Sequence, residues 1–231
     1  MGESYYYLRP VGELFAERAG ATTKLAVTAF SLAVLLGVPL GVFASVYRNT
    51  VLDRLTMGIA VAGYTIPNFV LGILMIFLFS LKMRILPSGG YGGLENYVMP
   101  VLAMMVGPMA NIARLTRSSM LDVLKQDYLD CARAKGVVEW VVIFRHALRN
   151  ALIPVVTIIG LQIGTLIGGM VVVETVFAWP GIGLLLISSA QNRDFPVVQY
   201  GIMICAIIVC ITNLLVDLSY ALLDPRIRDN F

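Results

Sequence analysis

The sequence predicts an all-α protein that crosses a membrane five times. Only 13% of its 231 residues are charged, whereas soluble domains usually carry about 25%. Five runs contain no Asp, Glu, Lys or Arg and are long enough to cross a hydrocarbon core about 30 Å thick. Backbone polar groups must be paired within lipid, so each run is expected to be a helix. The runs are residues 25–47, 55–81, 96–113, 150–173 and 195–216.

Two stretches differ from a simple span. Run 96–113 is the shortest and contains Pro100 and Pro108, so a tilted or kinked helix is expected there. Residues 175–192 also lack charge, but Trp179-Pro180-Gly181 interrupts any helix. The apolar stretch that follows is too short to span a bilayer. We therefore interpret 175–192 as a re-entrant or interfacial segment.

Residues at the ends of the spans have simple interpretations. Glu174 follows the fourth run directly, as a solvated or snorkelling end residue would. Trp179 and the row Tyr5-Tyr6-Tyr7 are typical of an aromatic belt at the outer membrane interface. None of these residues indicates a functional site by itself.

Basic residues predict the orientation of the chain. With five spans, the loops fall into two alternating sets, one with eleven Lys and Arg residues and the other with six. The richer set is expected to be cytoplasmic, which places the N-terminus outside and the C-terminus inside. The layout is then an external segment (1–24), a transmembrane permease domain (25–223) containing a cytoplasmic loop (114–149), and a cytoplasmic tail (224–231).

The N-terminal segment raises a difficulty for this orientation. It carries Arg9, Arg18 and Lys24 across the membrane, and it lacks the basic leader and apolar core of a signal peptide. A further apolar run of about 20 residues upstream of Met1 is therefore expected.

Several function classes have no support in the sequence. The three cysteines form no CxxC pair and His146 is the only histidine, so neither a metal site nor a disulfide framework is expected. No GxxxxGK[ST] phosphate loop, HExxH or GxSxG motif occurs. We predict a protein that is not an enzyme and that holds no cofactor.

The loop 114–149 has the pattern of a helix–glycine–helix element. Asp127, with Asp130 three residues on, can cap a short helix over residues 128–135. Gly136 ends that helix and is expected to adopt a left-handed backbone. A second amphipathic stretch, 137–150, leads directly into the fourth span. Such an element suits transfer of force from a cytoplasmic motor to the membrane, although a basic loop that only fixes orientation is the simpler alternative.

Five motifs in this order resemble the permease subunits of ATP-binding-cassette (ABC) importers, in the dipeptide, oligopeptide and nickel branch. They begin with Asp127-Tyr-Leu-Asp-Cys-Ala-Arg-Ala-Lys-Gly136, which is similar to the cytoplasmic "EAA" loop, with Asp130-Cys131-Ala132 in place of Glu-Ala-Ala. The likeness covers about residues 10–228. The other four motifs are Arg145–Thr157 (RHALRNALIPVVT), Glu174–Gly181 (ETVFAWPG), Asn192–Gln199 (NRDFPVVQ) and Leu222–Arg228 (LLDPRIR).

The resemblance implies a type I importer permease in the inner membrane of a prokaryote. Such a subunit pairs with a second permease, two cytoplasmic ATPases and an external substrate-binding protein, and it moves peptides or nickel complexes by alternating access. The resemblance implies an ATPase-coupling loop, assigned here to Asp130, Ala132, Arg133, Ala134, Lys135 and Gly136.

The lining of the transport path is less clear from the sequence. Three uncharged polar residues lie within the runs and are candidates for it: Asn68, Asn111 and Gln162. An ordinary hydrogen bond between helices is the alternative for each. Two other functions stay open, an ion-coupled secondary transporter and a non-transporting membrane scaffold. Charge-free spans disfavour the first, and an ATPase partner would exclude the second.

Overall fold

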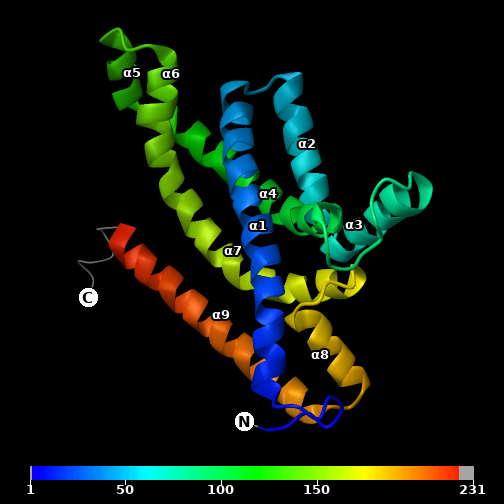
Figure 1. Cartoon of the computed structure of the whole chain (residues 1–231). Coiled ribbons are helices and arrows are strands. Elements are labelled where there is room, and N and C mark those ends of the chain that lie inside the picture. Colours follow the sequence, from blue (N-terminus) through cyan, green and yellow to red (C-terminus); the bar gives the residue numbers. More distant parts are fainter. Residues whose placement is uncertain (1, 224–231) are drawn as a thin grey trace. The chain divides into compact units, whose positions relative to one another are not determined.

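The computed structural model describes residues 2–223 (Figure 1), and the predicted tail at 224–231 lies outside them. Helices account for most of the described chain, and the one β-pairing there is an isolated bridge between Glu3 and Pro10. The elements are α1 (Val11–Val46), α2 (Val51–Thr65), α3 (Asn68–Met75), η1 (Ile76–Lys82), α4 (Leu94–Val123), α5 (Asp127–Ala134), α6 (Glu139–Val141), η2 (Val142–Ala147), α7 (Leu148–Val176), α8 (Ile182–Gln191) and α9 (Phe195–Leu223). Elements η1 and η2 are π-helices.

The predicted fold class, an all-α polytopic membrane protein, is confirmed. Within the described residues, four helical stretches are long and apolar enough to cross a membrane, and a broken helix pair makes up to five. Helix α8 has only ten residues, about 15 Å of helix, so the interpretation of 175–192 as something other than a span agrees with the structure.

The second apolar run is not one continuous helix. It divides into α2, which ends at Thr65, and α3, which begins at Asn68. Pro67 lies at the break with an extended backbone (φ −58°, ψ 139°). A proline disfavours the helical conformation of the residue before it and has no N–H to continue the hydrogen-bond ladder, which explains why Ile66 and Pro67 separate the two helices.

Several helices extend beyond their apolar runs. Helix α1 starts at Val11, well before residue 25. Helix α4 continues through Pro100 and Pro108 without interruption and ends at Val123, so the first part of the predicted cytoplasmic loop belongs to it. The added parts of the two helices, 11–24 of α1 and 114–123 of α4, contain the charged residues that were excluded from the apolar runs.

The described residues divide into two compact units. The first comprises residues 2–31, 66–106 and 163–215, and the second comprises 32–65, 107–162 and 216–223. In the first unit, the start of α1 packs on α8 and α9 through buried Val11, Leu14, Phe15, Leu185 and Val197. The residues of the coupling loop all lie in the second unit.

The N-terminal segment is fixed within the first unit by one carboxylate. Asp194 is buried between α8 and α9 and accepts hydrogen bonds from the Ser4 hydroxyl and from the backbone N–H groups of Tyr5 (3.1 Å) and Tyr6 (3.4 Å). Tyr5 and Tyr6 stay exposed, as the belt interpretation requires of them, whereas Tyr7 is half-buried against the cluster formed by α1, α8 and α9.

Candidate functional site

Helix α5 ends in a Schellman motif, as the glycine predicts. The N–H of Gly136 donates to the carbonyl of Arg133 (2.9 Å), and the N–H of Val137 donates to that of Ala132 (3.3 Å). Gly136 has a φ of +78°, the left-handed conformation that this motif needs at the residue after the cap. The predicted end of the helix and the predicted backbone of Gly136 are therefore confirmed.

The predicted cap at the start of this helix is wrong. Gln126 occupies the N-cap position with an extended backbone and makes no capping bond through its side chain, and Asp127 is already the first helical residue. Asp127 and Asp130 both lie in the first turn, where their negative charges favour the positive end of the helix dipole. The acidic pair thus stabilises α5 through charge rather than through a capping box.

Arg133 joins α5 to α6. Its guanidinium donates to Asp130 (2.9 Å) and, with two nitrogens, to both carboxylate oxygens of Glu139 (3.0 and 3.1 Å). The hydrogen bond with Glu139, followed by that with Asp130, raises the pKa of Arg133 above its ordinary value. Arg133 therefore links the two short helices on either side of Gly136.

The inner face of α5 is anchored by Leu129, a residue that no sequence motif indicates. Leu129 is fully buried in a cluster with Val42 of α1, Met120 and Val123 of α4, and Val142 of η2. Tyr128 adds a polar contact, because its hydroxyl donates to the carbonyl of His146 (3.2 Å) and accepts from Asn150 (2.7 Å). Helix α5 is therefore in direct contact with the ends of α1, α4 and α7.

The outer face of the same element is open. Asp130, Cys131, Ala134, Lys135 and Gly136 are exposed, whereas Ala132 is half-buried against the Leu129 cluster. Two large apolar side chains just beyond Gly136 are also exposed, Val138 at 63% and Trp140 at 64%. The combination of a buried inner face and an apolar, charged outer face is typical of a docking surface.

The three candidate path residues have different surroundings. Asn68 starts α3, and its amide lies close to Gly169 of α7. Asn111 accepts a hydrogen bond from Arg114 (3.2 Å) and lines a cavity of about 350 Å³ in the second unit. Gln162 is half-buried on α7. Of the three, only Asn111 lines a described cavity.

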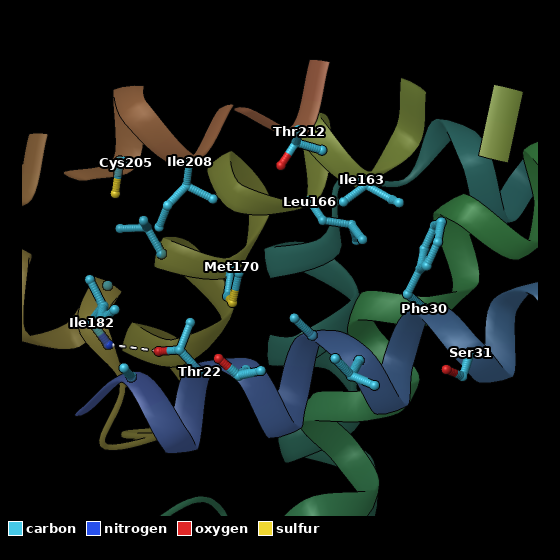
Figure 2. Close-up of a pocket in the computed structure, with 16 residues that line it drawn as sticks. Thr22, Phe30, Ser31, Ile163, Leu166, Met170, Ile182, Cys205, Ile208 and Thr212 are labelled. Carbon is cyan, nitrogen blue, oxygen red and sulfur yellow. Dashed lines mark hydrogen bonds between the residues drawn. The ribbon is translucent and has the colours of Figure 1, made fainter. Parts of the chain in front are cut away.

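A second cavity, of about 390 Å³, lies in the first unit and is mainly apolar. Figure 2 shows side chains of α1, α7, α8 and α9 around it. Thr22 lies at one end, where its hydroxyl accepts a hydrogen bond from the N–H of Ile182 (2.8 Å). No sequence motif indicated this cavity, because its lining is ordinary apolar helix surface.

Glu174 is not the solvated end residue that its position suggested. It is fully buried and accepts hydrogen bonds from the Thr22 hydroxyl (2.7 Å) and from the N–H groups of Gly183 (2.7 Å) and Leu184 (3.3 Å). Those two N–H groups belong to the first turn of α8, whose own N-cap, Gly181, offers no side chain. Glu174 and Thr22 thus satisfy the start of α8 from two other helices.

The remaining residues of this motif fit around the same carboxylate. A side chain at Gly181 would collide with the Glu174 carboxylate, and one at Gly183 would lie 2.5 Å from the Val171 Cα. Trp179 is 2% exposed and donates from its indole to the carbonyl of Ala21 (3.0 Å). The aromatic-belt interpretation of Trp179 is therefore wrong, since its ring is needed inside the first unit.

The predicted orientation can be checked with three thiols. In a background without the other cysteines, Ser88→Cys and Gln191→Cys, both exposed positions, are expected to react with a membrane-impermeant maleimide in intact cells. The native Cys131, also exposed, is expected to react only after permeabilisation, because its loop belongs to the more basic set. Labelling of Cys131 in intact cells, with protection at the other two sites, would reverse the orientation.

Comparison with known proteins identifies relatives by sequence and a shared fold by structure. Residues 37–229 match the family described as "Binding-protein-dependent transport system inner membrane component". The chain is 45% identical to the glutathione transport system permease protein GsiC of Escherichia coli, over 98% of this chain and 74% of that protein. The GsiC of Salmonella paratyphi A gives the same identity and coverage.

The fold is shared with solved structures of lower identity. The MetNI methionine ABC transporter in an inward-facing conformation matches with a TM-score of 0.78 at 20% identity, covering 93% of this chain and 98% of that chain. An amino acid ABC transporter matches with a TM-score of 0.73 at 15% identity, covering 91% and 94%.

Proposed function

Since this chain belongs to the binding-protein-dependent transport system inner membrane components and is the permease subunit of an ABC importer, we propose that it carries peptides into the cell. The class includes dipeptides, oligopeptides and the tripeptide glutathione, with nickel complexes as the second substrate candidate. The proposed assembly contains a second permease, two cytoplasmic ATPases and an extracytoplasmic substrate-binding protein. ATP-driven alternating access would move the substrate through the pair of permeases.

The observation that carries the ATP-driven part of this proposal is the arrangement of α5, which has one buried side and one open side. Its buried side, through Leu129, is packed against α1, α4 and η2. Its open side presents Asp130, Cys131, Lys135 and Gly136, next to Val138 and Trp140. We assign the ATPase contact to the segment from Asp130 to Gly136, because a push on its open side passes directly into three helices of the second unit.

The peptide class is supported by the relatives and by the composition of the spans. The curated relatives at 45% identity are named as glutathione permeases. The five apolar runs contain no charged residue, and a path that accepts peptides of varied sequence would have few fixed charges. An ion-coupled carrier, by contrast, usually places ionisable groups within its spans.

Reconstitution tests the proposal. The permease pair, its ATPases and the binding protein are placed in proteoliposomes with radiolabelled glutathione, a dipeptide or a nickel complex. ATP-dependent uptake of glutathione or the dipeptide is expected, together with protection of Cys131 from maleimide when the ATPases are bound. Uptake of the nickel complex alone would contradict the peptide class. Full reactivity of Cys131 in the assembled complex would remove α5 from the ATPase contact.

A further inference from the structure

The cavity of about 350 Å³ in the second unit has a polar side built from one face of α4. Asn111, Arg114, Leu115 and Ser118 line it, with Ile158 of α7 opposite them. The four α4 residues occupy positions i, i+3, i+4 and i+7, so they lie along one stripe of the helix. The cavity thus combines a cation, an amide and a hydroxyl with two aliphatic walls, and its size falls within the usual range for ligand pockets.

Arg114 and Arg117 lie three residues apart on α4 and have opposite surroundings. Arg117 makes a bidentate ion pair with Asp53 (2.6 and 2.7 Å), whose carboxylate is buried and also accepts from the N–H of Asn49 (2.9 Å). Arg114 forms no ion pair in the part of the chain that the structure describes. The charge of Arg117 is therefore neutralised within the protein, whereas that of Arg114 is available to a ligand.

The guanidinium of Arg114 is nevertheless held in position. One nitrogen donates to the amide oxygen of Asn111 (3.2 Å), and the guanidinium carbon lies 5.5 Å from the centre of the Tyr64 ring. A guanidinium carries five N–H donors in a planar fork, so most of them remain for an anion. This cation–π contact with Tyr64 favours one orientation of the fork.

We propose that Asn111, Arg114 and Ser118 form a binding site for the carboxylate of the transported peptide. The planar fork of Arg114 matches the two oxygens of a carboxylate. Ser118 and Asn111 flank it with groups that can pair with the adjoining peptide unit, and Leu115 and Ile158 provide apolar contacts for a side chain. The inference rests on the proposed peptide-import function and names the chemical group that this permease recognises.

The position of Arg114 supports a ligand within the transport path. It is the first charged residue after the run 96–113, so it lies at the predicted cytoplasmic end of the third span, where an imported solute leaves the membrane. Anchoring to a lipid phosphate uses the same chemistry, but it needs only a projecting cation. A recess with an amide and a hydroxyl on the same stripe offers three polar groups to one ligand.

The test compares a dipeptide that has a free C-terminal carboxylate with the same dipeptide as its C-terminal amide. ATP-dependent uptake of both is measured in proteoliposomes containing the complete transporter. The unsubstituted protein is expected to prefer the free acid by about tenfold or more, as for a charge-assisted bidentate contact. Arg114→Gln should reduce uptake of the acid to the level of the amide, and Arg114→Lys should keep part of the preference. Arg54→Gln, another exposed basic residue of the second unit, is the matched control and should keep all of it.

Three outcomes would overturn the inference, and they differ from one another. Equal loss of both peptides in Arg114→Gln, at normal abundance, would make Arg114 a general structural residue. An effect of Arg114→Gln that disappears when anionic lipids are omitted from the vesicles would assign Arg114 to a lipid phosphate. Equal uptake of acid and amide by the unsubstituted protein would exclude carboxylate recognition while leaving peptide import intact, whereas uptake of neither would contradict the proposed function itself.

Discussion

Gly136→Val is expected to abolish substrate uptake while leaving the amount of protein in the membrane nearly unchanged. Gly136 has a φ of +78° and open space around the position of a Cβ. A branched side chain there is strained by about 1–2 kcal/mol or more, and the Schellman end of α5 would reorganise to relieve it. Because Gly136 lies outside the apolar runs, membrane insertion should not depend on it.

Uptake in proteoliposomes and retention of the ATPase subunits on affinity purification measure this effect. Gly58→Val is the matched control, since Gly58 also has open space around its Cβ position but no positive φ. This variant should keep both substrate uptake and retention of the ATPase subunits. Gly136→Asn separates two causes, because asparagine tolerates the left-handed backbone. Recovery in Gly136→Asn would assign the defect to backbone strain, and a persistent defect would assign it to a side chain that blocks the ATPase surface.

Normal uptake by Gly136→Val at normal abundance would contradict the coupling assignment. Loss of the protein from the membrane would show instead that the segment is needed for folding. The two results are distinguished by immunoblotting of the membrane fraction before purification.

Features governed by neighbouring residues could be predicted from the sequence, and α5 is the clearest example. Its end at Gly136 follows from a helix-forming stretch followed by a residue without a Cβ. The sequence predicts that Arg133 belongs to the coupling contact, and the structure adds its bonds to Asp130 and Glu139. The partner of an exposed charge depends on how the chain turns after Gly136, which the local pattern does not specify.

Features governed by distant contacts could not be predicted in this way. Asp53 and Arg117 are 64 positions apart, and nothing near either residue indicates the other. The burial of Leu129 depends on α1, α4 and η2 meeting at one place. The break at Pro67 did have a local signal, since proline cannot continue a helix, but its effect is hidden when a run is judged by charge and length alone.

The error at Glu174 shows the same limit at a carboxylate. Its place after an apolar run suggested contact with solvent, because in the sequence it has no partner. In the structure, the turn through Trp179 and Pro180 brings the start of α8 back to it, and α1 contributes Thr22. The carboxylate then lies where three helices meet, and its polar partners are the N–H groups and the hydroxyl that would otherwise be buried without acceptors.

Glu174→Ala is therefore expected to lower the stability of the purified permease by about 2–4 kcal/mol. The substitution leaves the N–H groups of Gly183 and Leu184 without the acceptor they have now, and each unsatisfied buried donor costs about 1–3 kcal/mol. The substitution also leaves an empty space next to Gly181, because the carboxylate occupies the position that a side chain at Gly181 would take. The change is measured by heating the detergent-solubilised protein and recording, by size-exclusion chromatography, the fraction that remains folded at each temperature.

Two further variants determine whether the cap or the charge is responsible. Glu174→Gln retains one oxygen that can accept from Gly183 and Leu184, so it should recover a substantial part of the lost stability. Glu13→Ala removes a carboxylate from an exposed ion pair on the same unit and should unfold at the same temperature as the unsubstituted protein, since exposed pairs contribute little. Equal unfolding temperatures for Glu174→Ala and the unsubstituted protein would mean that α8 does not depend on this carboxylate. Equal destabilisation by Glu174→Gln and Glu174→Ala would show that the negative charge, rather than the acceptor geometry, stabilises the start of α8.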